Sequence, residues 1–443
     1  MAVLVASQTE PPVVAASFDI GSPDQSVQLL EIMTELFARY GDIFRVYSPA
    51  RKSYIYVIRN PDDVKRLMLS NHRNYTKGIG VDRVRLLLGN GILTSEGDFW
   101  HRQRTMMQPM FHRQIIASFA QVIDEENARL LERWAEISRD GKPINLTEEM
   151  SELTLQIVLR AIFGSDLERM SDESGGNPFL IFTREQARDI QFAQRFYALK
   201  RVLAALIARR RASSEEHFDY VSMLMSARDK ETGAAMGERE LIDEIMTLVV
   251  SGHETTANGL IWTWYLLSQH PEVESRLHSE VDSIPVTSGA PADTSPSERE
   301  RLVYTRQVID EALRLYPPGW LLSRRTIDAD VLSGYDIPGG ADILLPLYHL
   351  HRHPHSWPNP EAFLPERFAP DREPGRSKFA YMPFAGGPRH CIGESLALEE
   401  MRMHLHRVAR RFRLVHVADK PLVLEPQINL RTRDPILMRL EPR

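Results

Sequence analysis

The residues with the clearest capacity for chemistry lie in the stretch YMPFAGGPRHCIGESLALEEM, from Tyr381 to Met401. Cys391 is the single cysteine of the 443 residues, and it follows a glycine-rich run that must turn tightly. From Glu394 on, apolar residues three and four apart predict a helix. The positive end of that helix, together with Arg389 and His390, favours the thiolate. A buried structural cysteine is the alternative, although the crowded glycines favour a loop that can approach a flat ligand.

The spacing Phe384-x-x-Gly387-x-Arg389-x-Cys391-x-Gly393 resembles the haem-binding signature of the cytochrome P-450 family. The resemblance implies that Cys391 is the thiolate ligand of the iron in haem b, and that Arg389 lies near a haem propionate. It also implies that Phe384 packs beside the sulfur, and that Gly387 and Gly393 let the loop and helix approach the ring. A thiolate ligand donates electron density to the iron and favours O–O cleavage.

A second informative stretch runs from Leu241 to His270, thirty residues without proline. As one helix it would be about 45 Å long. Its apolar face is interrupted by Ser251-Gly252-His253-Glu254-Thr255-Thr256, and a glycine and three hydroxyls inside a buried helix cost stability. Such a local violation indicates a functional site. The alternative is a kink, or hydroxyls that bond back to the helix backbone.

This block resembles the I-helix motif of the same family. The resemblance implies that Glu254 and Thr255 hold and relay the protons that bound dioxygen needs in order to cleave. It also implies that Gly252 leaves room for dioxygen. Ser251 departs from the usual alanine or glycine and adds a hydroxyl to the site.

Two further motifs carry the resemblance. Trp100 and Arg104 share a helical face, and apart from the resemblance an arginine stacked on a tryptophan is the simpler interpretation. Their spacing resembles the C-helix motif, in which both donors bind a haem propionate. Glu311 and Arg314 could form an ordinary surface ion pair. Followed by Leu-Tyr-Pro-Pro, they resemble the K-helix motif, which implies a buried structural network with Arg367 that holds the cysteine loop.

The resemblance also suggests the substrate pocket and a further propionate partner. The expected pocket residues are Leu88, Leu248, Gly252, Trp320 and Leu321. Arg324 is the expected propionate partner, with the neighbouring Arg325 as the alternative register. The range 78–95 is glycine-broken and apolar, so we expect a loop that lines something, and the resemblance implies that this segment covers the substrate pocket.

Other elements must position these residues. Periodicity predicts a helix from Gln28 to Tyr40, strands at 43–47 and 54–58, a helix from Pro61, mainly helical structure over 114–211 and a helix over 308–316. Arg209 to Arg211 are expected to be a solvated helix end. The histidines between His349 and His355 could suggest a metal site, and surface histidines are the better interpretation.

Composition bounds the class of protein. The chain has 54 basic and 60 acidic residues, a net charge of −6, which gives no support for nucleic-acid binding. We expect an irregular lead-in over residues 1–24, then one large domain over 25–443 with the mainly α cytochrome P-450 fold and small β-sheets. The apolar run at the N-terminus is too short for a signal peptide or a spanning helix, so the sequence favours a soluble, cytoplasmic protein without a membrane anchor.

The resemblance implies a haem-thiolate monooxygenase that inserts one oxygen atom of O2 into a C–H or C=C bond. The expected substrate is an apolar small molecule, with fatty acids, terpenoids, steroids and polyketides fitting equally. Electrons are expected from a separate ferredoxin or flavodoxin that docks near Arg102, Arg113 and Arg389.

Three alternatives remain at this point. A haem-thiolate protein could perform other chemistry, such as peroxide-driven oxidation or isomerisation, although the Glu254-Thr255 pair argues against that. A cysteine-nucleophile hydrolase would need an oriented histidine base, and adjacent His390 points away from Cys391 along a regular backbone. A non-catalytic haem sensor would need no pocket for an organic substrate.

Overall fold

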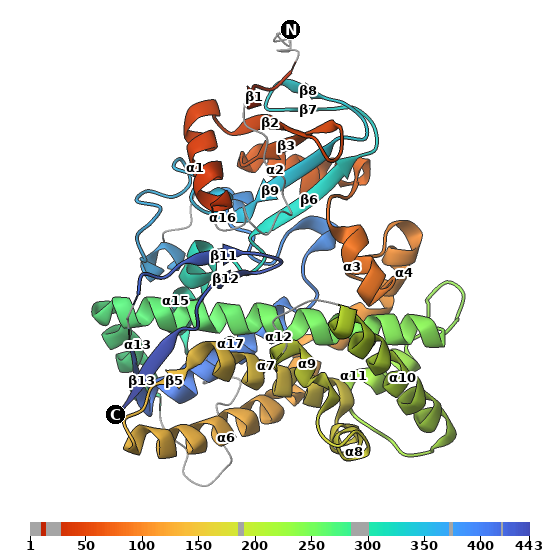
Figure 1. The fold of residues 1–443 in the computed structure, drawn as a ribbon, viewed down its shortest axis with the longest axis vertical. Coiled ribbons are helices and arrows are strands. Elements are labelled where there is room, and N and C mark those ends of the chain that lie inside the picture. Colours follow the sequence, from red (N-terminus) through yellow and green to blue (C-terminus); the bar gives the residue numbers. More distant parts are fainter. Residues whose placement is uncertain (1–9, 15–27, 185–189, 285–300, 372–374, 418–419) are drawn as a thin grey trace. The chain divides into compact units, whose positions relative to one another are not determined.

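The protein is mainly α-helical with small β-sheets, as expected (Figure 1). The computed structural model describes residues 10–14, 28–184, 190–284, 301–371, 375–417 and 420–443. Two compact units are present. The first comprises Met1–Val81, Gln307–Cys391 and Ala418–Asp434, and the second Asp82–Arg306, Ile392–Val417 and Pro435–Arg443. Each unit is assembled from three separate stretches of chain.

The first unit contains a six-stranded sheet with the order β1-β2-β3-β9-β6-β4. Its strands are β1 (Val13–Val14), β2 (Ile43–Ser48), β3 (Ser53–Ile58), β4 (Tyr75–Lys77), β6 (Leu321–Thr326) and β9 (Asp342–Pro346). Two hairpins accompany it: β7 (Asp330–Leu332) with β8 (Tyr335–Ile337), and β11 (Leu424–Pro426) with β12 (Leu430–Thr432). The helical elements are α1 (Leu29–Tyr40), α2 (Pro61–Lys65), the π-helix η2 (Arg66–Ser70), α15 (Val303–Leu315), α16 (Leu347–Leu350) and the 3-10 turns η3 (His72–Asn74), η6 (Pro365–Phe368), η7 (Lys378–Ala380) and η8 (Gly387–Arg389).

The predicted start of this unit is confirmed. Helix α1 ends at Gly41, whose φ of 82° only glycine adopts without strain, and whose N–H bonds the carbonyl of Phe37. Strands β2 and β3 confirm the two predicted strands, and they pair antiparallel with Ile43 opposite Ile58. One detail corrects the prediction of an irregular lead-in. Val13 and Val14 form β1, which pairs in parallel with β2, and two residues are too few to show a strand period.

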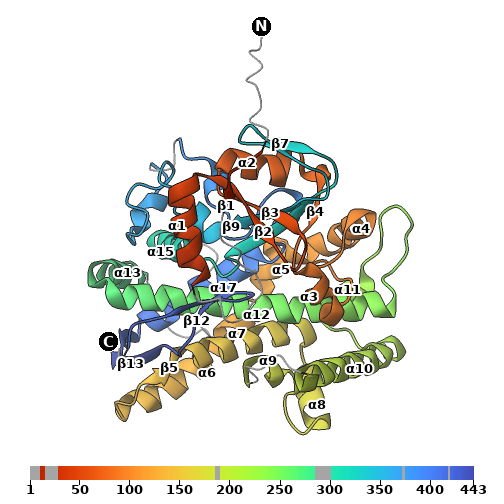
Figure 2. The ribbon, with the colours of Figure 1, turned by 45° about the horizontal axis from the view of Figure 1, so that its top comes forward.

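The second unit is built around α12 (Glu238–Gln269), a 32-residue helix that confirms the one predicted over Leu241 to His270 but begins three residues earlier and ends one residue earlier (Figures 1 and 2). The other helices are α3 (Val81–Leu88), α4 (Gly97–Met107), α5 (Arg113–Ser118), α6 (Ala120–Arg139), α7 (Leu146–Phe163), α8 (Asp166–Glu173), α9 (Ile181–Arg184), α10 (Ile190–Ala212), α11 (Tyr220–Ser226), α13 (Pro271–Ser283) and α17 (Glu394–Ala409). Short 3-10 turns are η4 (Gln108–Phe111) and η5 (Pro178–Leu180). Strands β10 (Phe412–His416), β13 (Leu437–Pro442) and β5 (Ile144–Asn145) form a three-stranded antiparallel sheet in that order.

Helix α12 packs along α7 (Figure 2), and the Cβ position of Gly252 lies close to a side chain of α7. A Cβ added at Gly252 would lie 2.7 Å from a methyl carbon of Val158. One turn of α7 earlier, the hydroxyl of Thr154 donates to the carbonyl of His253 at 3.1 Å. The glycine is therefore explained by helix packing. This corrects the expectation that its missing side chain leaves room for a ligand, because the open position faces α7.

The prediction of a loop over residues 78–95 is wrong in part, since Val81 to Leu88 form α3. Leu88 is buried with 2% of its surface exposed, whereas Leu86 is 73% exposed. The glycines on both sides suggested a loop, but none of them lies within the eight helical residues. Only part of the apolar run is therefore shielded from water in the described structure.

The prediction that Arg209 to Arg211 form a solvated helix end is wrong for the middle residue. Arg210 is 8% exposed. Its guanidinium donates to Asp166 and to Asp219, each at 2.7 Å, and to the carbonyl of Phe163 at 3.0 Å. Asp166 lies 44 residues before Arg210, and Asp219 lies nine residues after it, beyond the end of α10, so the charges along the helix itself did not reveal them. Arg210 ties α10 to the ends of α7 and α8.

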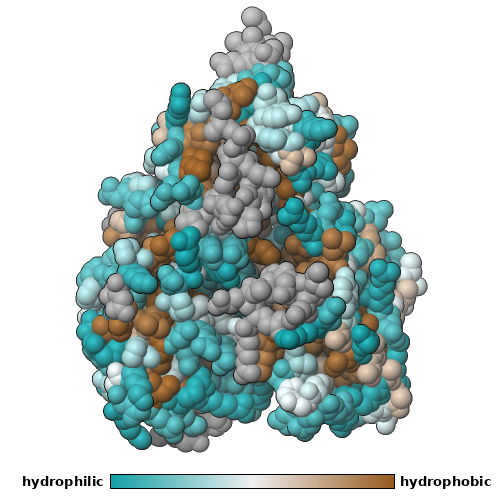
Figure 3. Space-filling view, viewed as in Figure 1, coloured by the Kyte–Doolittle hydropathy of each residue, from teal (hydrophilic) through white to brown (hydrophobic). Residues whose placement is uncertain are grey.

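The molecular face drawn in Figure 3 is mainly hydrophilic, with hydrophobic residues in scattered groups. Single exposed apolar residues of this kind are normal on a protein surface. Within the described ranges, no helix has both the length and the apolar character needed to cross a lipid bilayer.

Candidate active site

The cysteine loop closes on itself through backbone hydrogen bonds. The N–H of Cys391 donates to the carbonyl of Phe384 at 2.9 Å, and the N–H of His390 donates to the carbonyl of Gly387 at 3.0 Å. Gly387 has a φ of 65°, a conformation that favours glycine. Two residues after the thiol, Gly393 is the N-cap of α17. Cys391 therefore lies where the sequence placed it, at the end of a tight loop and in front of a helix.

The loop has the properties that a thiolate-bound haem requires. The Cys391 side chain is exposed, which is unusual for one of the most buried residue types. The helix end behind it favours a charged sulfur. An exposed sulfur in front of a helix end fits the expected cofactor. The expectation that Gly387 lets the loop approach the ring is corrected, because a Cβ added there would overlap the carbonyl oxygen of Met68, and one at Gly386 would lie 3.1 Å from the sulfur of Met382.

Glu311 of α15, itself fully buried, lies at the centre of an ion-pair network. Its carboxylate accepts from Arg314 at 2.7 Å and 2.8 Å, from Arg367 at 3.2 Å and from the N–H of Leu364 at 2.9 Å. Arg314 also donates to three backbone carbonyls, one of them that of His351. The pairing of Glu311 with Arg314 and Arg367 is the one that the resemblance implied, and neither Glu311 nor Arg314 exposes any side-chain surface.

His351 links this network to the cysteine loop. Its Nε2 accepts the N–H of Met382 at 2.9 Å, and Met382 precedes Phe384 by two residues. Burial lowers the pKa of His351 to about 3, and the nearby Arg314 acts in the same direction, so the ring is neutral and can accept. The geometry gives the network a route to the loop that carries the thiol.

The prediction of surface histidines between His349 and His355 is wrong for three of the four. His349, His351 and His353 are each less than 5% exposed. His353 bonds Asp42 at 3.0 Å, and His349 lies 3.1 Å from the carbonyl of Leu30. Their spacing of two residues gave no indication that the short helix α16, which contains His349, and the segment after it would be buried. The described residues contain no group of three His, Cys, Asp or Glu side chains that could hold a metal ion.

Strand β6 distinguishes Arg324 from Arg325. The guanidinium of Arg325 donates to Asp342 at 2.9 Å and 3.0 Å, so it is engaged in an ion pair. Arg324 points to the opposite face of the strand, where its guanidinium contacts the sulfur of Met68 at 3.3 Å. Just before the strand, Trp320 is buried and its indole N–H donates to the carbonyl of Gln427 at 2.8 Å. The half-buried Leu321 follows it.

The polar stretch of α12 contains a ladder of hydroxyl groups. Thr255 donates to the carbonyl of Ser251 at 2.8 Å, and Ser251 donates to the carbonyl of Thr247 at 2.7 Å. Glu254 and Thr255 are half-buried. The alternative of satisfied back-bonds is therefore real, but a hydroxyl that donates to the backbone keeps its lone pairs and can still accept a proton. In the same unit, Leu248 is buried in the apolar core.

Helix α4 carries Trp100 and Arg104 on one face, both half-buried. Arg102 on the same helix requires a correction. It was expected to offer positive charge to the electron-donor protein, but it forms a bidentate ion pair with Glu240 of α12 at 3.0 Å and 3.2 Å. Its charge is therefore matched within the protein. Arg113 at the start of α5 is exposed.

Two acids of α12, overlooked in the sequence, clamp the segment that follows α3. Asp243 accepts the N–H of Asn90 at 2.9 Å, and Glu244 accepts the N–H of Ile92 at 2.9 Å. Glu244 is fully buried, and it also accepts from Gln103 at 3.0 Å. The available signal was an acid three residues from Leu241, on the apolar face of the helix. The clamp holds the segment in which the pocket was expected.

Burial raises the pKa of Glu244 to about 7, despite the two hydrogen bonds that favour its ionised form. The charged groups around it are Asp243 and Glu240, which raise the pKa further, and Lys200, which pairs with Asp243. The Oε1 atom of Gln103 has no partner in the described structure, and turning this amide over would let it accept the proton of neutral Glu244.

We expect Glu244→Gln to change how stability depends on pH. The folded wild type binds this proton up to about pH 7, whereas an unfolded glutamate, with its ordinary pKa of 4.5, releases it earlier. The contribution of neutral Glu244 to the free energy of unfolding is therefore fully present below pH 4.5 and is lost as the pH rises through 7. The free energy of unfolding of the variant minus that of wild type should therefore increase by about 1–3 kcal/mol as the pH rises from 5 to 8.

Denaturant unfolding at several pH values measures this, and Glu240→Gln is the matched control. Hydrogen bonds from Arg102 and from the backbone of Gly237 lower the pKa of Glu240 against the effect of burial, so the control should show no such gain. A difference between Glu244→Gln and wild type that does not vary with pH would contradict the prediction.

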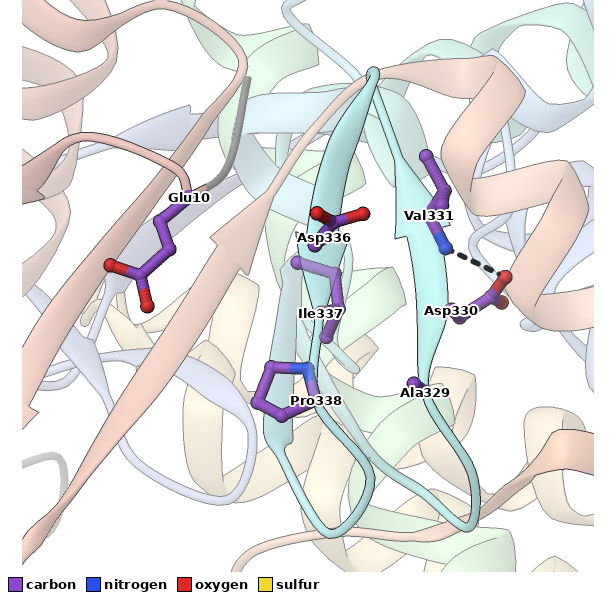
Figure 4. Close-up of a pocket in the computed structure, with 7 residues that line it drawn as sticks. All are labelled: Glu10, Ala329, Asp330, Val331, Asp336, Ile337 and Pro338. Atoms are coloured by element: carbon purple, nitrogen blue, oxygen red, sulfur yellow. Dashed lines mark hydrogen bonds between the residues drawn. The ribbon is translucent and has the colours of Figure 1, made fainter. Parts of the chain in front are cut away.

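A surface depression of about 340 Å³ lies in the first unit (Figure 4). Its lining consists of Glu10 and residues of the β7–β8 hairpin, namely Ala329, Asp330, Val331, Asp336, Ile337 and Pro338. None of the expected pocket residues lines it, and the cysteine loop does not contribute. We therefore do not regard it as the substrate site.

The fold and the cysteine loop define a class of protein, and comparison with known proteins agrees. The sequence pattern of the cytochrome P-450 family matches residues 7–209 and 177–439. The chain therefore belongs to the cytochrome P-450 family, with a haem-iron cofactor. It is a monooxygenase, and this excludes the hydrolase and the sensor.

Individual relatives are similar over nearly the whole chain. Cyclooctatin synthase of Streptomyces melanosporofaciens is 32% identical over 88% of this chain and 86% of its own length. Cyclooctat-9-en-7-ol 5-monooxygenase of the same organism is 32% identical over 85% of this chain and 83% of its own. The crystal structure of the cytochrome P450DA heme domain superposes with a TM-score of 0.85 at 23% identity, covering 99% of this chain and 98% of that one, which shows the fold.

Proposed function

We propose that this monooxygenase oxygenates a terpenoid, a largely hydrocarbon substrate with rings. The observation that carries the proposal is the similarity to two Streptomyces relatives, one of which is named as oxygenating cyclooctat-9-en-7-ol at position 5. Leu88, Leu248, Trp320 and Leu321, expected to line the pocket, are all apolar, which suits such a substrate. Gly252 is left out of the pocket because its open side faces α7.

Cys391 would hold haem b through its thiolate, and the bound haem would supply the activation of dioxygen. Phe384 would pack against the sulfur. The propionates would be bound by Arg389 and Arg324 and by the donors Trp100 and Arg104. Support for Arg324 over Arg325 comes from the ion pair that already engages Arg325 with Asp342. Glu311, Arg314 and Arg367 would keep the loop in place through His351.

Proton delivery would fall to Thr255 and Glu254. The hydroxyl of Thr255 donates to the carbonyl of Ser251, so its oxygen is held in one position and can pass a proton on. Glu254 is half-buried and so can exchange protons with water. Their role is to hold protons at the site and to limit the water that reaches it.

Thr255→Ala is expected to uncouple electron consumption from product formation. Without the hydroxyl, reduced dioxygen would be released more often as peroxide, and product per electron should fall roughly tenfold. The measurement compares product, peroxide and reductant consumed in one assay.

Thr263→Ala is the matched control, because Thr263 lies two turns further along α12 and makes the same kind of bond, to the carbonyl of Gly259 at 2.7 Å. If both variants kept the wild-type yield of product per electron, Thr255 would have no relay role.

Electrons would come from a separate ferredoxin or flavodoxin, and the protein would work in the cytoplasm. With Arg102 paired to Glu240, the remaining exposed cation on the docking face we predicted is Arg113. Arg113→Glu should slow reduction and weaken its dependence on salt. An unchanged rate of reduction with unchanged salt dependence would show that the electron donor docks at another surface.

The proposed substrate class is tested by optical titration of the ferric protein. Cyclic terpenoids should shift the haem band from low to high spin, whereas linear fatty acids of similar size should not. A shift with fatty acids alone would overturn the substrate class but not the monooxygenase.

A further inference from the structure

The cysteine loop rests against the π-helix η2. A Cβ added at Gly387 would overlap the carbonyl oxygen of Met68 in the middle of η2. The side chain of Met68 also contacts Arg324, our proposed propionate partner, at 3.3 Å. A π-helix is rare and is often found at functional sites. Through one residue, η2 therefore contacts both the loop that carries the thiol and a cation expected to bind the haem.

Both ends of η2 are held by one carboxylate on the β7–β8 hairpin, that of Asp330. Arg66, the first residue of η2, donates to it through Nε at 2.9 Å, and Asn71, which follows the last, donates at 2.9 Å. The hydroxyl of Tyr75 donates to it as well. The N–H of Val331 completes the set at 2.8 Å (Figure 4).

This carboxylate is 8% exposed, so it must be matched by these donors. Burial by itself would raise the pKa of Asp330, but the hydrogen bonds from Arg66, Tyr75 and Asn71 lower it to about 2. The site is therefore a permanently charged anchor at neutral pH. A second contact, from the N–H of Ser333 to Asp63 at 2.8 Å, joins the same hairpin to α2.

We propose that Asp330 is a positioning residue for the haem-thiolate loop, acting through η2 on Gly387 and Arg324. The proposal rests on Cys391 as the iron ligand, and it goes beyond that assignment. In this arrangement the hairpin fixes where the Met68 carbonyl lies, and the carbonyl fixes how far the loop can move toward η2. Loss of the anchor loosens the sulfur without touching any residue that contacts the haem.

The test is Asp330→Asn in the haem-loaded protein, compared with Asp342→Asn. Asp342 is an equally buried aspartate of the same unit, 5% exposed, paired with Arg325 and Arg51, and it is not bonded to η2. The readout is the carbon monoxide spectrum of the reduced protein, which distinguishes thiolate-bound from thiolate-free haem. We expect the ratio of thiolate-free to thiolate-bound protein to rise about tenfold in Asp330→Asn and to stay at the wild-type value in Asp342→Asn.

A second readout uses the haem-free protein, in which the amides of His390 and Cys391 should exchange hydrogen faster in Asp330→Asn alone. If Asp330→Asn does not fold, Tyr75→Phe, which removes one donor, should give the same changes at smaller size. Equal changes in the two aspartate variants, or none in Asp330→Asn and Tyr75→Phe, would overturn the proposal. A wild type without a thiolate spectrum would overturn the ligand assignment instead.

Discussion

Replacing Cys391 with serine is expected to abolish monooxygenase activity while the fold is kept. The side chain is exposed, and the loop is closed by the backbone bond from Cys391 to Phe384, which serine can also make. A serine hydroxyl is not ionised at neutral pH, so it cannot replace the soft, charged ligand. Turnover should fall at least about a hundredfold, more than is typical when only an outer partner of a metal ligand is lost.

The carbon monoxide spectrum and turnover should change together, while far-ultraviolet circular dichroism should not. Ser395→Ala, at an exposed position in the first turn of α17, is the control for a change near the helix start. Wild-type turnover in Cys391→Ser, which has no cysteine left to bind the iron, would show that the reaction does not depend on the thiolate, and our account of the site would fail.

The second large effect is expected on stability, from Glu311→Gln. The carboxylate is fully buried between Arg314 and Arg367, and losing its charge leaves two guanidinium groups without their counter-ion. Removing one partner of a buried ion pair typically costs about 3–5 kcal/mol. Because His351 connects this network to Met382, we also expect faster loss of haem.

Denaturant unfolding and the rate of haem transfer to apomyoglobin measure the two effects. Glu361→Gln is the matched control, since Glu361 is exposed and pairs with Arg352 at 2.9 Å, and exposed pairs contribute about 0–1 kcal/mol. Similar free energies of unfolding for the two variants would show that the buried network is not a stabilising centre. If Glu311→Gln gives no folded protein, Arg367→Lys offers a milder loss.

The sequence predicted those parts of the site that are local in the chain. The Cys391 loop is built from a glycine-rich turn and a helix start, both readable over a few residues. Helix α12 was evident from a long run of residues without proline, and the strands β2 and β3 were evident from their β-branched and aromatic residues. In each case the local conformational preference of a continuous stretch of residues is enough to determine the structure.

What the sequence could not show depends on contacts between distant residues. Arg210 looked solvated because Asp166 and Asp219 lie on other elements. Gly252 looked like space for a ligand until Val158 of α7 was seen beside it. Asp330, Met68 and Gly387 are far apart in the chain, and no periodic pattern connects them. Helix α3 was missed because its flanking glycines outweighed a short amphipathic run.

Strand β13 has a consequence for how the chain folds as it is made. It is the middle strand of its sheet, with β10 on one side and β5 on the other. Leu437 of β13 pairs with Asn145 of β5. Because these residues are far apart in the chain, β5 leaves the ribosome long before β13 has been synthesised. Until Leu437–Pro442 emerges, that edge and the buried side chain of Ile144 stay uncovered, and pairing so distant in sequence is slow and prone to aggregation. Slow induction at low temperature, with chaperones present, should therefore raise the yield of native enzyme.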